Sequence, residues 1–505
     1  MSRDLEALSK FVASPSAAVM GVVVGEIVLY FLAGRAVAAL VTRRGREVGR
    51  DWYTAAYVAV GGLAVNFVAF LVLFAGVHSL RAAYAISLVL FAGVAIWRWR
   101  ALINFRVGWA LLVLVLMVFA FRVPGATLLQ AEPQMWDEFT HWAGRARQIL
   151  LLDRLPVAGE PLSGVAPHYG LFATMLAVGS YVPLGREVAG AGIAWSLIFT
   201  LIMAIHSYEY LRRHGVSRLF AGPACTWFLA WMMRGQDLLA TSMYADIFVA
   251  VGGMLAVLHL CDFGLPSVGE TRRAEDGLLA ASGLGILVFT KTTGDVIAAG
   301  AIGYAGLVLL IGAIARRSPR TVLAGGVAIV LAVIPALGIR AAWMGYGHLN
   351  NPSAEQLLLE RGGRVSDVVH RPEVPWGKMI GVTFDGIVHE EPYSVLLAAL
   401  PGCILLDVFL RAVSGRRPRS ARLSLLLGWT PLVVVMFAVV LNVTFGPGRA
   451  NLDGGRYLAA LLPVLLCYLV SVGARFVEWA VSFDGGVLYT RDAATSPVDS
   501  GPKTA

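Results

Sequence analysis

The sequence predicts an all-α polytopic membrane protein, and three observations carry this prediction. Hydrophobic residues make up 58% of the 505 residues, charged residues only 14%, and the mean hydropathy is +0.72. A soluble globular protein has about 25% charged residues, so a water-soluble domain is excluded. The hydrophobic residues also gather in runs close to the roughly 20 residues that an α-helix needs to cross a bilayer.

Thirteen apolar runs follow one another along the chain, and we expect them to form one bundle of about 13 transmembrane helices. The runs cover approximately 18–42, 53–77, 82–97, 108–124, 189–210, 218–233, 241–261, 278–290, 294–315, 321–344, 393–412, 422–443 and 457–475. The runs at 218–233 and 278–290 are short for a hydrocarbon core of about 30 Å, so tilted or broken helices are expected there. The apolar stretch 168–184 is expected to be a partly inserted or interfacial helix.

The basic residues predict how the bundle is oriented. Lys and Arg gather in loops that share one side if all thirteen runs cross the membrane and 168–184 does not; these loops are 43–51, 98–106, 211–218, 262–277, 316–320 and 411–422. The positive-inside rule makes that side the cytoplasm. The net charge of +9 therefore reflects topology and contact with anionic lipid head groups, and nucleic acid is not an expected partner.

The same orientation divides the chain into a transmembrane domain over 1–475 and a cytoplasmic tail over 476–505. The tail is polar and contains proline, which predicts disorder. Two long loops then face the outside, one over 125–188 and one over 345–392. Most of the polar residues that helix packing does not explain fall on this outer side.

The first outer loop contains a stretch with helical periodicity. Its apolar residues share one face of a helix; they are Phe139, Trp142, Ala143, Ala146, Ile149 and Leu150. Its polar residues line the opposite face and are expected to meet water; they are Asp137, His141, Arg145 and Gln148, with Glu138 beside them. This pattern is typical of a helix in the membrane interface. A solvated connecting helix is the alternative, but an acidic pair at the start of the helix favours a functional role.

Five short motifs follow one another over residues 108–315. They are Trp136-Asp137-Glu138-Phe139, Pro167-His168-Tyr169-Gly170-Leu171, Tyr210-Leu211-Arg212-Arg213, Met243-Tyr244-Ala245-Asp246 and Phe289-Thr290-Lys291-Thr292-Thr293-Gly294. In order and approximate spacing this series resembles the GT-C glycosyltransferases that use polyprenyl-phosphate sugars. The closest likeness is to the branch of protein O-mannosyltransferases and lipid A aminoarabinose transferase.

The resemblance implies a GT-C-like bundle with interfacial helices in the first outer loop. It also implies an enzyme that moves a sugar, with inversion, from a polyprenyl-phosphate donor to a glycan, lipid or protein acceptor of the cell envelope. The active site would face the outside of a bacterial plasma membrane. Two departures leave the sugar and the acceptor open: His168-Tyr169-Gly170 replaces a proline pair, and Thr292-Thr293 separate Lys291 from Gly294.

Glycosyl transfer from a lipid phosphate needs a base that takes the proton of the acceptor, and Asp137 is the predicted base. Like charge on Glu138 and proximity to the membrane can raise its proton affinity. Glu138 is the second predicted catalytic residue, with an exposed first-turn acid as the alternative. No cofactor is required by the sequence, although the two carboxylates leave a divalent cation, Mg²⁺ or Mn²⁺, as an open alternative.

The departing phosphate needs positive charge, and the outer side offers several basic side chains. The predicted ligands of the donor phosphate are His168, Lys291 and Arg456, with Arg145 and Arg449 as further candidates. His141 is predicted to bind substrate as well. Lys291 is the most telling, because it separates two apolar runs and such a lysine is costly unless it faces a polar cavity or snorkels to the interface. Asp295, one helical turn later, is a candidate counterion for Lys291.

Tyrosines and one acid complete the predicted substrate-binding set: Tyr169, Tyr244, Asp246 and Tyr457. Asp246 begins an apolar run, where it positions an acceptor or a metal, or alternatively caps the helix. Arg456-Tyr457 stands at the mouth of the last run after a glycine-rich turn, and membrane anchoring is its alternative role.

Two other functions fit the layout. The 345–392 loop is compatible with an O-antigen polymerase or ligase of GT-C type. A transporter or flippase for a lipid-linked sugar is the alternative from another class, but it would hold charges at mid-membrane and show internal repeats. The charges here gather at the ends of the runs, which favours an enzyme.

Overall fold

The computed structural model describes residues 15–41, 53–98, 113, 142–160, 162, 169–232, 245–266, 274–350, 393–413, 419–436 and 461–483. Within these ranges the chain is almost entirely helical and has no β-strand. The elements are α2 (Pro15–Val41), α3 (Thr54–Phe74), α4 (Leu80–Trp97), α7 (Gly144–Leu152), α8 (Phe172–Leu184), α9 (Ala189–Arg213), α10 (Arg218–Met232), α11 (Asp246–Gly264), α12 (Ala274–Thr290), α13 (Thr292–Arg316), α14 (Pro319–Asn350), α17 (Tyr393–Val413), the 3₁₀-helix η3 (Arg419–Gly428) and α20 (Leu462–Phe483).

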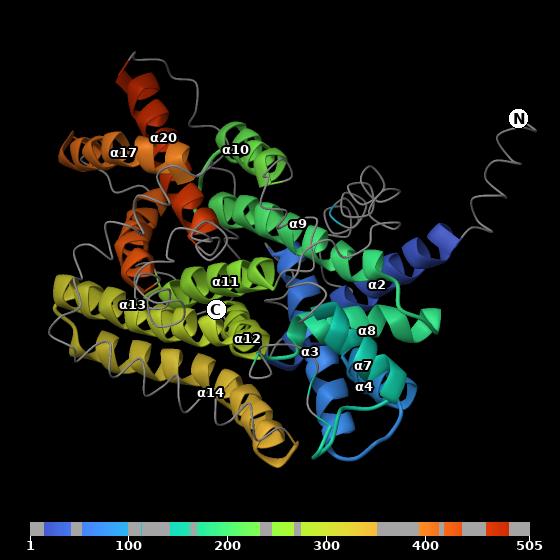
Figure 1. Cartoon of the computed structure of the whole chain (residues 1–505). Helices are drawn as coiled ribbons and strands as arrows, with labels where there is room; N and C mark the ends of the chain where they lie inside the picture. Colours follow the sequence, from blue (N-terminus) through green and yellow to red (C-terminus); the bar gives the residue numbers. More distant parts are fainter. Residues whose placement is uncertain are drawn as a thin grey trace, which may run out of the picture.

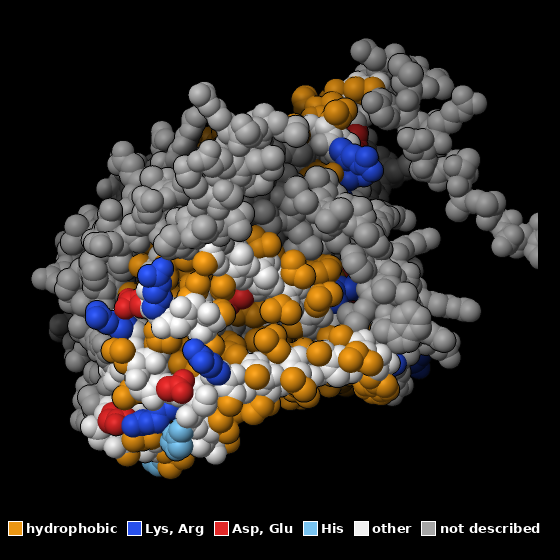
Figure 2. All heavy atoms as spheres, turned by 90° about the vertical axis from the view of Figure 1, so that its right-hand side faces the viewer, with side chains coloured by type: hydrophobic (Ala, Val, Ile, Leu, Met, Phe, Trp, Pro, Cys, Tyr) orange, Lys and Arg blue, Asp and Glu red, His pale blue; other side chains and the backbone are white. Residues whose placement is uncertain are grey.

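Nine of the described helices are long and apolar enough to cross a membrane: α2, α3, α4, α9, α11, α13, α14, α17 and α20. Figure 2 shows one face of the molecule, on which hydrophobic side chains form a broad band and charged side chains gather toward one edge. A band of this kind suits contact with lipid tails, since the hydrocarbon core excludes charge. The protein is therefore an α-helical membrane protein.

The predicted apolar runs correspond to helices wherever the structure describes them. The two runs that are short for a span form α10 with 15 residues and α12 with 17 residues. The run 422–443 begins inside η3 and continues as a helix to Met436, while α20 extends past the predicted end at 475 to Phe483. The run 108–124 lies outside the described residues except for Val113. Nine spanning helices in the described part support the multi-pass architecture without testing the number thirteen.

Helix α8 occupies the stretch expected to lie in or beside the membrane interface. It has only 13 residues, and every residue from Phe172 to Tyr181 is buried. Neighbouring helices provide this burial, because α8 packs on α2, α3, α7 and α9. The helix is therefore enclosed by other helices of the protein.

Helix α11 lies at the centre of the bundle (Figure 1). Its spanning segment is 94% buried, whereas the corresponding segments of α14 and α17 are only 33% and 17% buried. Helix α14 turns Leu323, Leu331 and Leu337 outward, as a helix that faces lipid should. Among the described spanning helices α11 is therefore the most enclosed, and its first residue, Asp246, belongs to the candidate site below.

Helices α11 and α12 pack with their backbones in direct contact at two glycines. A Cβ atom added to Gly283 would lie 2.5 Å from the Ala256 nitrogen and 2.7 Å from the Gly252 carbonyl oxygen. Small residues at such a crossing allow the close approach that drives helix association in membranes. The crossing makes α11 and α12 a tight pair.

We expect Gly283→Ala to lower the thermal stability of the purified protein, because the new methyl group meets backbone atoms that cannot rotate away. Overpacking of this kind costs about 1–3 kcal/mol. Gly326→Ala on α14 is the matched control, because a Cβ atom there has no heavy atom within 4 Å. Equal melting temperatures for the two variants in detergent would contradict the close packing.

Candidate functional site

A buried ion pair joins the start of α11 to the turn between α12 and α13. The Lys291 Nζ atom donates a hydrogen bond of 2.5 Å to Oδ1 of Asp246, and both side chains are about 95% buried. Lys291 has an extended backbone (φ −161°, ψ 165°) that ends α12 and begins α13. Helices α11 and α12 run side by side in opposite directions. Asp246, the first residue of α11, therefore lies next to Lys291, which directly follows the last residue of α12.

Aromatic side chains from the first outer loop cover this pair. Lys291 Nζ lies 5.8 Å from the centre of the Tyr169 ring, which stacks on Trp142 at 5.8 Å with an angle of 10° between the rings. A cation over an aromatic face is stabilised by the ring quadrupole, and more strongly where water is excluded. Tyr169 therefore connects the ion pair to α7.

The Arg145 guanidinium lies behind these rings. It donates a hydrogen bond of 3.3 Å to the Tyr169 carbonyl oxygen and is 5.9 Å from the Trp142 ring centre. Burial lowers the pKa of Arg145 to about 10, which keeps the group protonated at neutral pH. The described cluster thus holds two cations and one carboxylate, so its charge suits a further anionic group.

The prediction that Arg145 faces water is wrong, because the residue is completely buried. Trp142, Ala146 and Ile149 are buried as the apolar periodicity predicts. The Tyr169 segment covers a second side of α7, and that side includes Arg145. Helical periodicity identifies the most apolar face of a helix, but it does not reveal a second packing partner.

Three contacts fix the loop around α7 on the ends of other helices. The Leu80 amide, at the start of α4, donates to Asp153 Oδ1 at 2.9 Å, and the Tyr346 hydroxyl on α14 donates to the Pro156 carbonyl oxygen at 2.7 Å. A Cβ atom on Gly170 would lie 2.2 Å from the Phe289 carbonyl oxygen. All these segments were assigned to the same side of the membrane by the alternation of spans, and their mutual contacts agree with that assignment.

The candidate counterion Asp295 does not pair with Lys291. Its Oδ2 atom instead lies 2.7 Å from a guanidinium nitrogen of Arg340 on α14. Spacing along one helix suggested Asp295, whereas the actual partner Asp246 is 45 residues away along the chain. The N-cap position of α11 is Ala245, and Asp246 is an acidic residue of the first turn.

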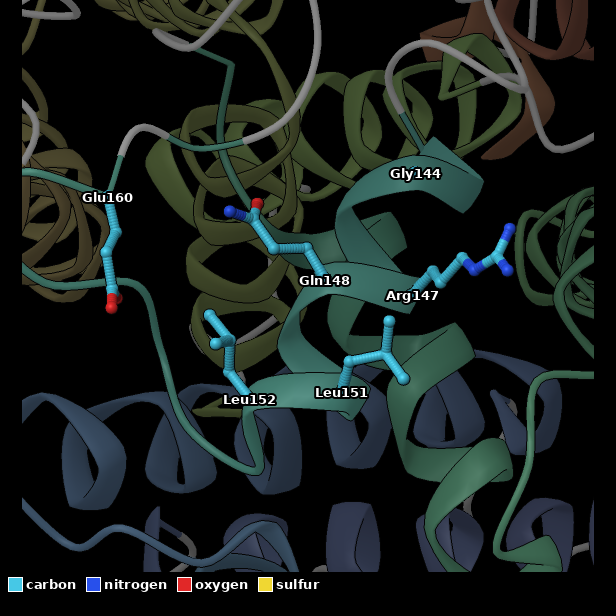
Figure 3. Close-up of a pocket in the computed structure, with 6 residues that line it drawn as sticks. All are labelled: Gly144, Arg147, Gln148, Leu151, Leu152 and Glu160. Carbon is cyan, nitrogen blue, oxygen red and sulfur yellow. The ribbon is translucent and has the colours of Figure 1, made fainter.

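A hollow of about 470 Å³ lies on the exposed side of α7, lined by Gly144, Arg147, Gln148, Leu151, Leu152 and Glu160. In Figure 3 Gln148 and Leu152 project on the side of α7 nearer Glu160, and Arg147 projects on the other side. Glu160 accepts two hydrogen bonds from Arg154, which lower its pKa to about 2. Such a carboxylate stays ionised and is a poor proton acceptor at neutral pH.

No family model, curated protein or solved structure matches this chain. The candidate site is therefore described by the positions of its own residues, and not by comparison with a known protein.

Four predicted site residues come together in this geometry: Arg145, Tyr169, Asp246 and Lys291. The other predicted residues lie outside the described part of the chain; they are Asp137, Glu138, His141, His168, Tyr244, Arg449, Arg456 and Tyr457. The 351–392 portion of the second outer loop also lies outside it. Among the described residues, no group of three or more His, Cys, Asp or Glu side chains is arranged to hold a metal ion. Trp142 was predicted only as an apolar residue, and nothing in its sequence context indicates its stacking on Tyr169.

We expect Gly170→Ala to change the packing of the candidate site more than the packing of the helical bundle. The added methyl group would push Tyr169 away from the α12–α13 turn and remove its ring from Lys291. Gly222→Ala on α10 is the matched control, since a Cβ atom there has no neighbour within 4 Å. Intrinsic fluorescence should change for Gly170→Ala, because Tyr169 stacks on Trp142, and should stay the same for the control.

Proposed function

We propose that this protein is a membrane glycosyltransferase. It moves a sugar from a polyprenyl-phosphate donor to an acceptor of the cell envelope, at the extracytoplasmic face of a bacterial plasma membrane and with inversion at the sugar carbon. The series of five motifs that resembles the GT-C glycosyltransferases is the basis of the proposal. Membrane lipids surround the enzyme, and the donor reaches the site from the bilayer.

One structural observation supports the proposal most. Arg145, Tyr169, Asp246 and Lys291 come from four segments between 145 and 291 and meet at one end of the bundle. Three of these residues belong to separate motifs of the series, and the fourth follows the Asp137-Glu138 motif by seven residues. Motifs that serve one reaction must meet in space, and the motifs that contain Tyr169, Asp246 and Lys291 do so. The Tyr210-Leu211-Arg212-Arg213 motif lies at the opposite end of the bundle, where Arg213 pairs with Asp276, and Asp137-Glu138 lies outside the described residues.

The proposed reaction assigns each group a role. Asp137 takes the proton of the acceptor hydroxyl while the acceptor oxygen attacks the anomeric carbon and the bond to the lipid phosphate breaks. The electron pair of that bond leaves with the phosphate, whose growing negative charge Lys291 and Arg145 stabilise. Asp246 holds the Lys291 ammonium group in place and limits the energetic cost of burying it.

The test uses the purified full-length protein in lipid nanodiscs with a radiolabelled polyprenyl-phosphate sugar and a cell-envelope extract as acceptor. We expect label in the extract and free polyprenyl phosphate in equal amounts. A transporter reconstituted in liposomes would instead move the intact donor across the membrane. If label stays on the lipid with every donor sugar offered, the protein is not this kind of transferase.

A further inference from the structure

The proposed reaction does not use the hollow on the exposed side of α7, although this hollow is large enough for a ligand. Its volume is about 470 Å³, and ligand pockets in proteins measure about 300–1,000 Å³. Helix α7 contributes most of the lining, and Glu160 contributes from the loop that follows the helix. We call this cavity the α7 hollow.

The α7 hollow lies beside the ends of spanning helices. In the loop after α7, Asp153 accepts a hydrogen bond from the amide of Leu80, the first residue of α4, and Pro156 accepts one from Tyr346 near the end of α14. Both α4 and α14 are long and apolar enough to cross a membrane. A water-soluble ligand therefore reaches the hollow without entering the hydrocarbon core.

The charged groups around the α7 hollow cancel one another. Arg154 donates hydrogen bonds of 2.7 and 2.8 Å to the two carboxylate oxygens of Glu160, and Arg147 Nε lies 3.4 Å from Oε2 of Glu187. Two cations and two carboxylates leave no net charge, whereas the candidate site holds two cations and one carboxylate. An anionic lipid phosphate is therefore attracted to the candidate site, and the α7 hollow suits a neutral ligand.

The polar groups of the hollow suit hydroxyl groups. Glu160 accepts three hydrogen bonds from described residues, two from Arg154 and one from the Val157 amide. A carboxylate offers about four acceptor positions, which leaves about one for a hydroxyl group of a ligand. The amide of Gln148, on the side of α7 nearer Glu160 in Figure 3, carries both a donor and an acceptor.

The leucines of the hollow add apolar surface. Leu151 is 77% exposed, and Leu152 beside it is partly exposed. A sugar ring presents apolar C–H groups on its faces and hydroxyl groups at its edge. The α7 hollow therefore offers matching surfaces to an uncharged sugar chain.

Helix α7 stands between the hollow and the candidate site. Arg145 and Arg147 are two residues apart, which places them on nearly opposite sides of a helix with 3.6 residues per turn. A helix with its side chains is about 10–12 Å across, so the two sites are about one helix apart. Gly144, which lines the hollow, follows the predicted base Asp137 by only seven residues.

We propose that the α7 hollow binds the acceptor and that the acceptor is a neutral polysaccharide of the cell envelope. Glu160 and Gln148 hold its hydroxyl groups, Leu151 and Leu152 contact its rings, and α7 separates it from the lipid phosphate. Calling this ligand the acceptor rests on the proposed function, whereas binding of a neutral glycan in the hollow does not.

The binding test needs no sugar donor. Glycans released from the cell-envelope extract are separated on an anion exchanger into a neutral and an anionic fraction and labelled with a fluorophore at the reducing end. Fluorescence anisotropy then measures their binding to the full-length protein in nanodiscs, with empty nanodiscs as the blank. We expect the wild type to bind the neutral fraction and to leave the anionic fraction free.

Two variants locate the bound glycan. Glu160→Gln should weaken binding about tenfold, the effect of losing one hydrogen bond to a charged group. Gln148→Trp should weaken binding further, because the indole fills the hollow. Leu219→Trp on α10, at a position that is 75% exposed, is the matched control and should bind like the wild type. If Gln148→Trp does not fold, Glu160→Gln decides.

Three binding results would overturn the proposal: wild-type affinity in the folded hollow variants, preference for the anionic fraction, or no binding of the neutral fraction above the blank. In the transfer assay, label should enter the neutral glycan, and Glu160→Gln should raise the KM for the acceptor but not for the donor. Label found only in lipid or protein would overturn the acceptor assignment while supporting the transferase. Glycan binding without any transfer would count against the proposed function alone.

Discussion

Replacement of Asp137 by Asn is expected to abolish sugar transfer while the protein still folds and binds its lipid donor. Asparagine has nearly the same shape as aspartate but cannot take a proton from the acceptor hydroxyl. Loss of a general base lowers a rate by about 10²–10⁴-fold. The measurement is the initial rate of label transfer at saturating donor, together with donor binding by the same preparation.

Glu138→Gln provides the matched control, because the two carboxylates are neighbours and have the same charge. If Asp137 is the base, Glu138→Gln should reduce the rate less than Asp137→Asn does. A rate lost only in Glu138→Gln would transfer the role of base to Glu138. Full activity in Asp137→Asn would remove the proposed mechanism.

Removal of one partner of the Asp246–Lys291 pair is expected to produce the largest loss of stability. Asp246→Asn leaves the Lys291 ammonium buried without its carboxylate, and Lys291→Met leaves the Asp246 carboxylate buried without its cation. Breaking a buried ion pair from one side costs about 3–5 kcal/mol. Thermal unfolding of each variant in detergent measures this loss.

The double variant Asp246→Asn/Lys291→Met separates stability from catalysis. A neutral pair of similar volume leaves no unpaired charge, so much of the lost stability should return. Activity should stay low, because Lys291 would no longer be available to the departing phosphate. Recovery of both stability and activity in the double variant would show that the pair has only a structural role.

Arg340→Met tests whether the loss of stability depends on how deeply an ion pair is buried or only on the presence of an ion pair. Arg340→Met breaks the ion pair with Asp295, which is partly exposed on both sides. Partly exposed pairs contribute less than buried ones because water screens them. A smaller loss of stability in Arg340→Met than in Lys291→Met is therefore the internal control for the burial argument.

Local sequence determined the helical architecture and predicted which helix ends share one side of the bundle. Apolar runs broken by short polar segments predicted the helices because each span must satisfy its own backbone hydrogen bonds in lipid. Lys291 between two apolar runs predicted the turn that separates α12 from α13. The alternation of spans then assigned the ends of α4, α11 and α14 to one side, where the structure brings them into contact with the loop around α7 or the α12–α13 turn.

Tertiary packing alone decided which polar groups pair and which are buried. Asp246 and Lys291 are 45 residues apart, His206 and His259 are 53 residues apart, and Asp295 turns to Arg340 on another helix. Helical periodicity predicts the face of a helix on which a side chain lies. It does not predict which other segment packs on that face. Arg145 illustrates the limit, because only the arrival of the Tyr169 segment converts a polar helix face into a buried one.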